Sequence, residues 1–102
     1  VRFNMEADSL NCAILAPDAA PGTEEFELFI KEVVKEMTVK AGQKCTAVRR
    51  TIVPAGMEED VIKAIRARLE KTVVGDPSVE GVRMGPLASK GQVRDVGLAA
   101  ER

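Results

Sequence analysis

The sequence predicts an α/β fold in which strands alternate with helices in a largely parallel, layered sheet. Three observations support this fold class. A nearly continuous apolar run at 11–16 stops at Pro17, an amphipathic stretch follows at about 23–40, and a β-branched run at 46–53 ends at Pro54. The 102 residues are enough for one domain but not for two.

The composition excludes several classes of protein. Hydrophobic residues make up 45% and charged residues 30% of the chain, and no apolar run approaches the ~18 residues that a membrane span needs. With 15 Lys+Arg against 16 Asp+Glu, and with 3 Phe but no Trp or Tyr, a nucleic-acid partner is not expected. The absence of His removes Ser–His and Cys–His catalysis and most zinc sites, so no metal is expected. Two cysteines and a polar first segment without a signal peptide predict a cytoplasmic protein.

The first half of the chain predicts two strands and one long helix. Residues 1–5 alternate in polarity like the end of a strand, and 11–16 suit a strand buried on both faces. A helix over about 23–40 begins at Thr23 as its N-cap and is followed by Gly42 in the position typical of a helix C-terminus. Apolar residues at helical spacing mark its buried face: Phe26, Phe29, Ile30, Val33, Val34 and Met37.

The second half predicts a strand at 46–53, a helix at about 57–71 and a turn at 75–77. After an irregular segment, Ser89 and Gln92 have the spacing of a capping box and begin a third helix. The residues spaced for the buried face of that helix are Val93, Val96 and Ala100.

Cys45 is the first candidate for chemistry. It lies between the predicted helix end and a strand, where a loop can present a nucleophile in a crevice. Lys44, Arg49 and Arg50 would favour its thiolate if they approach it, whereas the negative end of the helix dipole opposes this. Alternatively, Cys45 is buried and packs as a small hydrophobic residue, as most free cysteines do. The spacing of the residues leaves both interpretations open.

Glu6 is the second candidate, at the end of the first apolar segment. A carboxylate in an apolar crevice can act as a general base, although a solvated acid at a strand end is the simpler interpretation. Cys12, in an apolar strand, is expected to pack in the core.

The run Ala-Gly-Gln-Lys-Cys-Thr-Ala-Val-Arg-Arg at 41–50 resembles the catalytic-cysteine segment of the aldehyde dehydrogenase superfamily. In that family a Gly-Gln-x-Cys run follows an amphipathic helix and leads into a strand. Val-Gly-Asp-Pro at 74–77 and Gly-Pro-Leu at 85–87 resemble two further signatures in the family's order, and Glu6 occupies the place of its general base. The resemblance covers essentially the whole chain, which implies that 1–102 is a partial aldehyde dehydrogenase catalytic domain.

The segment around Glu6 departs from the common family run Glu-Leu-Gly-Gly-Lys, because it reads Glu-Ala-Asp-Ser-Leu-Asn. Together with the run at 36–45, this variant resembles the branch found in bifunctional proteins of phenylacetate degradation. In that branch the aldehyde dehydrogenase domain oxidises a ring-opened CoA-thioester semialdehyde. The resemblance therefore implies a small-molecule aldehyde as substrate, linked to CoA.

The resemblance also implies a mechanism. The Cys45 thiolate attacks the aldehyde carbon, hydride passes to the nicotinamide of NADP or NAD, and Glu6 activates the water that hydrolyses the resulting thioester. The backbone N–H of Cys45 would be one oxyanion-hole donor. Ala7 would lie beside the cofactor.

The sequence lacks the Gly-x-Gly-x-x-Gly fingerprint, and in the family the cofactor-binding domain precedes the region that corresponds to this chain. We therefore expect this chain to be a piece of a longer, homo-oligomeric enzyme. On its own, the piece should bind the cofactor poorly, be inactive and expose apolar surface. The alternative is a non-catalytic α/β module with a structural or oligomerisation role, in which Cys45 is a spectator.

Overall fold

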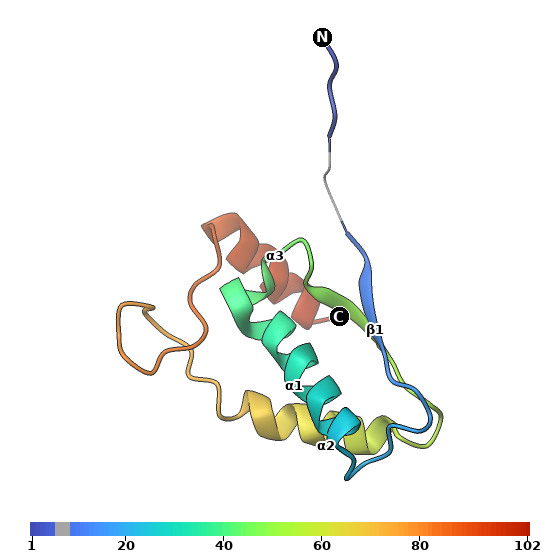
Figure 1. The fold of residues 1–102 in the computed structure, drawn as a ribbon. Coiled ribbons are helices and arrows are strands. Elements are labelled where there is room, and N and C mark those ends of the chain that lie inside the picture. Colours follow the sequence, from blue (N-terminus) through green and yellow to red (C-terminus); the bar gives the residue numbers. More distant parts are fainter. Residues whose placement is uncertain (6–8) are drawn as a thin grey trace.

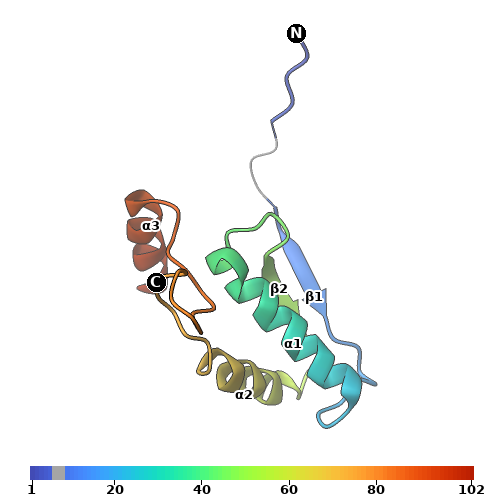
Figure 2. The same ribbon diagram turned by 60° about the vertical axis from the view of Figure 1, so that its left-hand side comes forward.

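The computed structural model describes residues 1–5 and 9–102 (Figure 1). Two strands and a crossover helix form its centre, and the two strands are parallel as predicted. Figure 2 shows the crossover helix lying across one face of this pair. In chain order the elements are β1 (Asn11–Ile14), α1 (Glu24–Thr38), the 3-10 helix η1 (Val39–Gly42), β2 (Val48–Ile52), α2 (Glu58–Leu69) and α3 (Lys90–Ala100).

The sheet is covered on one face only by the described part of the chain. Along β1, Asn11 and Ala13 are half-buried, whereas Cys12 is exposed and Ile14 is 67% exposed. The prediction of a strand buried on both faces was therefore wrong, since two-sided burial requires a second layer that no described residue supplies. Residues 1–5 are also not a strand: they are exposed and pair with no described segment, and an alternating pattern without a partner strand does not form a ladder.

Helix α1 begins where the sequence predicts. The Phe26 N–H donates a hydrogen bond to Thr23 Oγ1 at 3.2 Å, which confirms Thr23 as the N-cap. The helix ends at Thr38 with Val39 as its C-cap, so the prediction that Gly42 directly follows the helix end was wrong. Instead, the 3-10 helix η1 follows α1 directly and ends at Gly42.

The hydrophobic core lies between α1, α2 and the end of β1. Apolar side chains of α2 pack against those of α1, and an exposed ion pair joins Arg68 Nη2 to Glu27 Oε2 at 3.0 Å across the same interface. Helix α2 lies inside the predicted range 57–71. The core cluster consists of Leu15, Ala19, Phe26, Ile30, Val34 and Val61.

The C-terminal third is held more loosely. The predicted turn is present, with Asp76 accepting a hydrogen bond from Ser78 N–H, and the Gln92 N–H donates to Ser89 Oγ at 3.2 Å, which confirms the N-cap of α3. The predicted buried face of α3 was wrong: no residue of this helix is buried, and Val93 is 57% exposed. The spacing of apolar residues identified the helix correctly, but burial also needs a surface to pack against. No helix in the described part of the chain is long and apolar enough to cross a membrane.

Candidate active site

Cys45 lies in the turn that joins η1 to β2, and its side chain is exposed. This excludes the interpretation of Cys45 as a buried small hydrophobic residue. Three successive residues, Lys40, Ala41 and Gly42, precede it with positive φ angles of 52°, 55° and 71°. At Gly42 a Cβ would lie 3.2 Å from the Met37 carbonyl oxygen, so both the backbone angle and the available space favour glycine.

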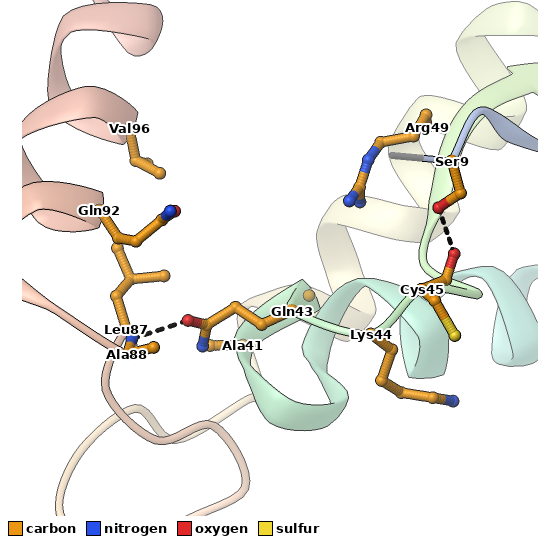
Figure 3. A pocket seen from close by; sticks show the side chains of 11 residues that line it. Ser9, Ala41, Gln43, Lys44, Cys45, Arg49, Leu87, Ala88, Gln92 and Val96 are labelled. Atoms are coloured by element: carbon orange, nitrogen blue, oxygen red, sulfur yellow. Dashed lines mark hydrogen bonds between the residues drawn. The ribbon is translucent and has the colours of Figure 1, made fainter. Parts of the chain in front are cut away.

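Two polar side chains, one just before β1 and one at its first residue, hold the carbonyl group of Cys45. Ser9 Oγ and Asn11 Nδ2 both donate short hydrogen bonds to the Cys45 carbonyl oxygen (Figure 3 shows the bond from Ser9). Asn11 Nδ2 also lies 3.3 Å from the Ala47 carbonyl oxygen. These bonds join the cysteine turn to the segment that leads into β1. Sequence reasoning missed both residues, because the pairing of β1 with β2 brings them to the turn.

Glu36 on α1 binds both neighbours of Cys45. Its carboxylate accepts hydrogen bonds from Lys44 Nζ at 2.9 Å and from Thr46 Oγ1 at 3.1 Å. The hydrogen bond from Lys44, assisted by that from Thr46, lowers the pKa of Glu36 below its usual value of 4.5. Lys44 is therefore ion-paired with Glu36. That a nearby cation favours the Cys45 thiolate stays a prediction.

A cavity of about 580 Å³ lies beside the cysteine turn. One wall comes from Ser9, the segment 41–45 and Arg49, and the other from Leu87, Ala88 and α3 (Figure 3). The cavity thus brings together two runs that the sequence analysis singled out, Gly-Gln-Lys-Cys and Gly-Pro-Leu. Of the predicted cations near Cys45, Arg49 and Lys44 line this cavity and Arg50 does not. Gln92 and Val96 are the residues of α3 that line the opposite wall.

Hydrogen bonds from Gln43 connect the two walls. The Ala88 N–H donates to Gln43 Oε1 at 2.7 Å, and Gln43 Nε2 lies 3.3 Å from the Pro86 carbonyl oxygen. In Figure 3 the Cys45 side chain points away from Gln92, so it is the backbone of the cysteine turn that faces α3 in this view.

The other predicted site residues, Glu6 and Ala7, lie outside the described residues. The described glycines with positive φ angles, Gly22, Gly42, Gly56 and Gly81, occupy separate turns and do not gather in one loop as in the Gly-x-Gly-x-x-Gly arrangement.

An exposed cysteine, in the turn before the second strand of a crossover unit and beside a cavity, defines a candidate nucleophile site of an α/β enzyme. The chain belongs to the aldehyde dehydrogenase family, which it matches over residues 1–102.

Three curated relatives are semialdehyde dehydrogenases by name. The chain is 59% identical over 92 residues to 3,4-dehydroadipyl-CoA semialdehyde dehydrogenase of Aromatoleum evansii. These matched residues make up 90% of the chain and 18% of the relative. The chain is 34% identical over 92 residues to alpha-ketoglutaric semialdehyde dehydrogenase of Bacillus subtilis, with the same coverage. It is 30% identical over 95 residues to 3-succinoylsemialdehyde-pyridine dehydrogenase of a Pseudomonas species, covering 93% of the chain and 19% of the relative. The chain therefore spans less than a fifth of the length of these relatives.

Proposed function

We propose that this chain is the catalytic-cysteine part of a longer NAD(P)-dependent aldehyde dehydrogenase and that Cys45 is its nucleophile. The observation that carries the proposal is the exposure of Cys45 in a turn held on both sides, at the wall of a cavity. The family membership supports the same role, because the Gly-Gln-Lys-Cys run is the segment that resembles the family's catalytic cysteine.

We infer that the substrate is a CoA-linked semialdehyde of phenylacetate catabolism. The support is the similarity to the Aromatoleum evansii enzyme, whose name states a CoA-linked semialdehyde, and the variant run that begins at Glu6. The more distant relatives are named for semialdehydes without CoA. This specificity can be tested by comparing the rates at which the full-length enzyme oxidises a CoA-linked semialdehyde and the corresponding free acid semialdehyde.

The proposed chemistry uses two side chains and one backbone group of this chain. The sulfur of Cys45 forms a bond to the aldehyde carbon, which gives a thiohemiacetal, and the Cys45 N–H stabilises the oxyanion. NAD(P)⁺, when bound by the longer protein, supplies the acceptor for the hydride. Glu6 then activates the water that hydrolyses the thioester on Cys45. Ser9, three residues after Glu6, is bonded to the Cys45 carbonyl, which supports a role for this part of the chain beside the cysteine.

The test is alkylation of the full-length protein by a slow aldehyde mimic, with and without NADP⁺, followed by peptide mapping. We expect labelling confined to Cys45 and accelerated by the cofactor. Cys12, which is also exposed, is the internal control for accessibility without catalysis. Cys45→Ala should abolish aldehyde oxidation and Cys12→Ala should retain it. Retained turnover in Cys45→Ala, or preferential labelling of Cys12, would refute the proposal and favour a non-catalytic module.

The isolated chain of 102 residues should neither oxidise aldehydes nor hold the cofactor, because it corresponds to 18% of the length of the Aromatoleum evansii enzyme and the resemblance implies that the cofactor-binding domain is a separate part of the protein. We propose that the full-length enzyme is a cytoplasmic homo-oligomer. Apolar side chains exposed on several elements, including Ile14, Leu28 and Val74, support the view that further protein covers this surface. Light scattering of the isolated chain should detect self-association, and a clean monomer at high concentration would contradict this.

A further inference from the structure

Gln43 lies two residues before Cys45 and joins two segments that are far apart in the sequence. Its Oε1 accepts a hydrogen bond from the Ala88 N–H at 2.7 Å, and its Nε2 donates one to the Pro86 carbonyl oxygen at 3.3 Å. The side-chain amide therefore pairs with the backbone of 86–88 through one donor and one acceptor, as a neighbouring strand would. Figure 3 shows the bond to Ala88 crossing between the two walls of the cavity.

The same amide stabilises the turn that leads to Cys45. Gln43 Nε2 donates to the Lys40 carbonyl oxygen at 2.8 Å, and the Gln43 backbone N–H donates to that oxygen at 3.1 Å. Lys40 and Ala41 adopt left-handed backbone angles, which residues other than glycine rarely occupy. The two bonds to one carbonyl hold this unfavourable conformation in place directly before the cysteine.

The opposite wall of the cavity lies between the bridge of Val74 with Met84 and the exposed helix α3. No residue of α3 is buried, and Gln92 and Val96, which line the cavity, belong to this helix. The segment 86–88 leads directly into α3, so the hydrogen bonds from Gln43 set where the helix begins relative to the cysteine turn. A change at Gln43 should therefore alter the cavity without removing any group that reacts.

We propose that Gln43 is a positioning residue, which fixes the cysteine turn relative to the opposite cavity wall by holding the backbone of 86–88. This inference rests on the proposed role of Cys45 as the nucleophile. Gln43 acts through the backbone on both sides of the cavity and takes no part in bond making at the substrate.

The experiment compares Gln43→Met with Gln92→Met in the full-length protein. Gln43→Met keeps the length of the side chain and removes all three of its hydrogen bonds. Gln92→Met makes the same chemical change in the same cavity, at a side chain that forms no hydrogen bond within the described residues.

In Gln43→Met the Ala88 N–H should exchange about threefold to tenfold faster, as expected for one lost hydrogen bond. The kcat for aldehyde oxidation should fall roughly tenfold to a hundredfold from misplacement of the nucleophile, with a smaller change in KM. In Gln92→Met the Ala88 exchange rate should stay at the wild-type value.

Gln43→Glu provides the conservative rescue. Its carboxylate can still accept the Ala88 N–H but cannot donate to the carbonyl oxygens of Lys40 and Pro86. Slow exchange at Ala88 should return, together with part of the lost kcat, and this variant carries the test if Gln43→Met fails to fold. Unchanged Ala88 exchange and kcat in Gln43→Met, or equal losses in Gln92→Met, would overturn the inference. Activity retained in Cys45→Ala would instead overturn the proposed function, and the exchange rate at Ala88 would still report whether Gln43 ties the walls together.

Discussion

Replacing Ile30 by Ala should loosen the helix that positions the cysteine turn. Ile30 is 0% exposed and packs in the cluster formed with α2 and the end of β1. Removing a fully buried isoleucine down to alanine costs about 2–5 kcal/mol, because the lost transfer energy adds to that of the cavity left behind. Domains of ordinary size have a total stability of only about 5–15 kcal/mol, so this one change consumes a large share of it.

The measurement is native-state hydrogen exchange of the α1 amides in the full-length protein, because a multidomain enzyme does not unfold in a single step. A loss of about 2 kcal/mol corresponds to exchange roughly 30-fold faster, since each 1.4 kcal/mol is a factor of ten. Ile30→Val should cost about 0.5–1.5 kcal/mol. Lys31→Ala, at an exposed polar position on the same helix, is the matched control and should change stability by about 0.5 kcal/mol or less. Equal acceleration in Ile30→Ala and Lys31→Ala would refute the packing of α1 described here.

Three further predictions follow from local geometry. Thr23→Ala removes the N-cap of α1 and should cost about 1 kcal/mol, measured by exchange of the first-turn amides. Gly42→Ala should cost about 1–2 kcal/mol because of its positive φ, whereas Gly97→Ala, in a helix with open space around it, should gain up to about 1 kcal/mol; equal effects at both positions would contradict the strained turn. The lowered pKa of Glu36 means that its bonds contribute stability above pH 4.5, and this contribution is lost as the pH falls through the lowered pKa. Glu36→Gln should therefore be less stable than wild type at pH 7, and the difference should vanish in acid; a difference that persists at low pH would contradict this origin.

The parts of the fold that depend on neighbouring residues could be predicted from the sequence. The start of α1 at Thr23 and the start of α3 at Ser89 are set by a side chain three residues from the amide that it caps, so a short window contains the whole signal. The parallel strand pair followed from the alternation of strands and helices. In contrast, the burial of β1 and α3 depends on what covers them, and this information is not in their own residues. Apolar spacing therefore identified helix α3 but overstated its burial.

In the candidate site, too, the features set by neighbouring residues could be predicted and those set by distant parts of the chain could not. The run around Cys45 pointed to the cysteine, but the contacts of Glu36 with Lys44 and Thr46 depend on how the chain reverses after α1. That reversal uses left-handed angles at Lys40 and Ala41, two residues for which no sequence rule predicts such a conformation. The ion pair of Lys44 with Glu36 could not be predicted for this reason, since it is the turn that brings the ammonium group to that carboxylate.

The position of Cys45 depends on polar contacts much more than on burial. Ser9 and Asn11 hold its carbonyl group, Glu36 holds its two neighbours, and Gln43 ties the turn to the opposite wall, while the cysteine itself is exposed. Hydrogen bonds and ion pairs in contact with water contribute little, but they strengthen when the surroundings exclude water. If the rest of the enzyme covers this face, the same contacts become stronger without any change in their geometry. A site built in this way gains its rigidity on assembly of the full protein. Substitutions of Gln43 and Glu36 should therefore have larger effects in the full-length enzyme than in the isolated chain.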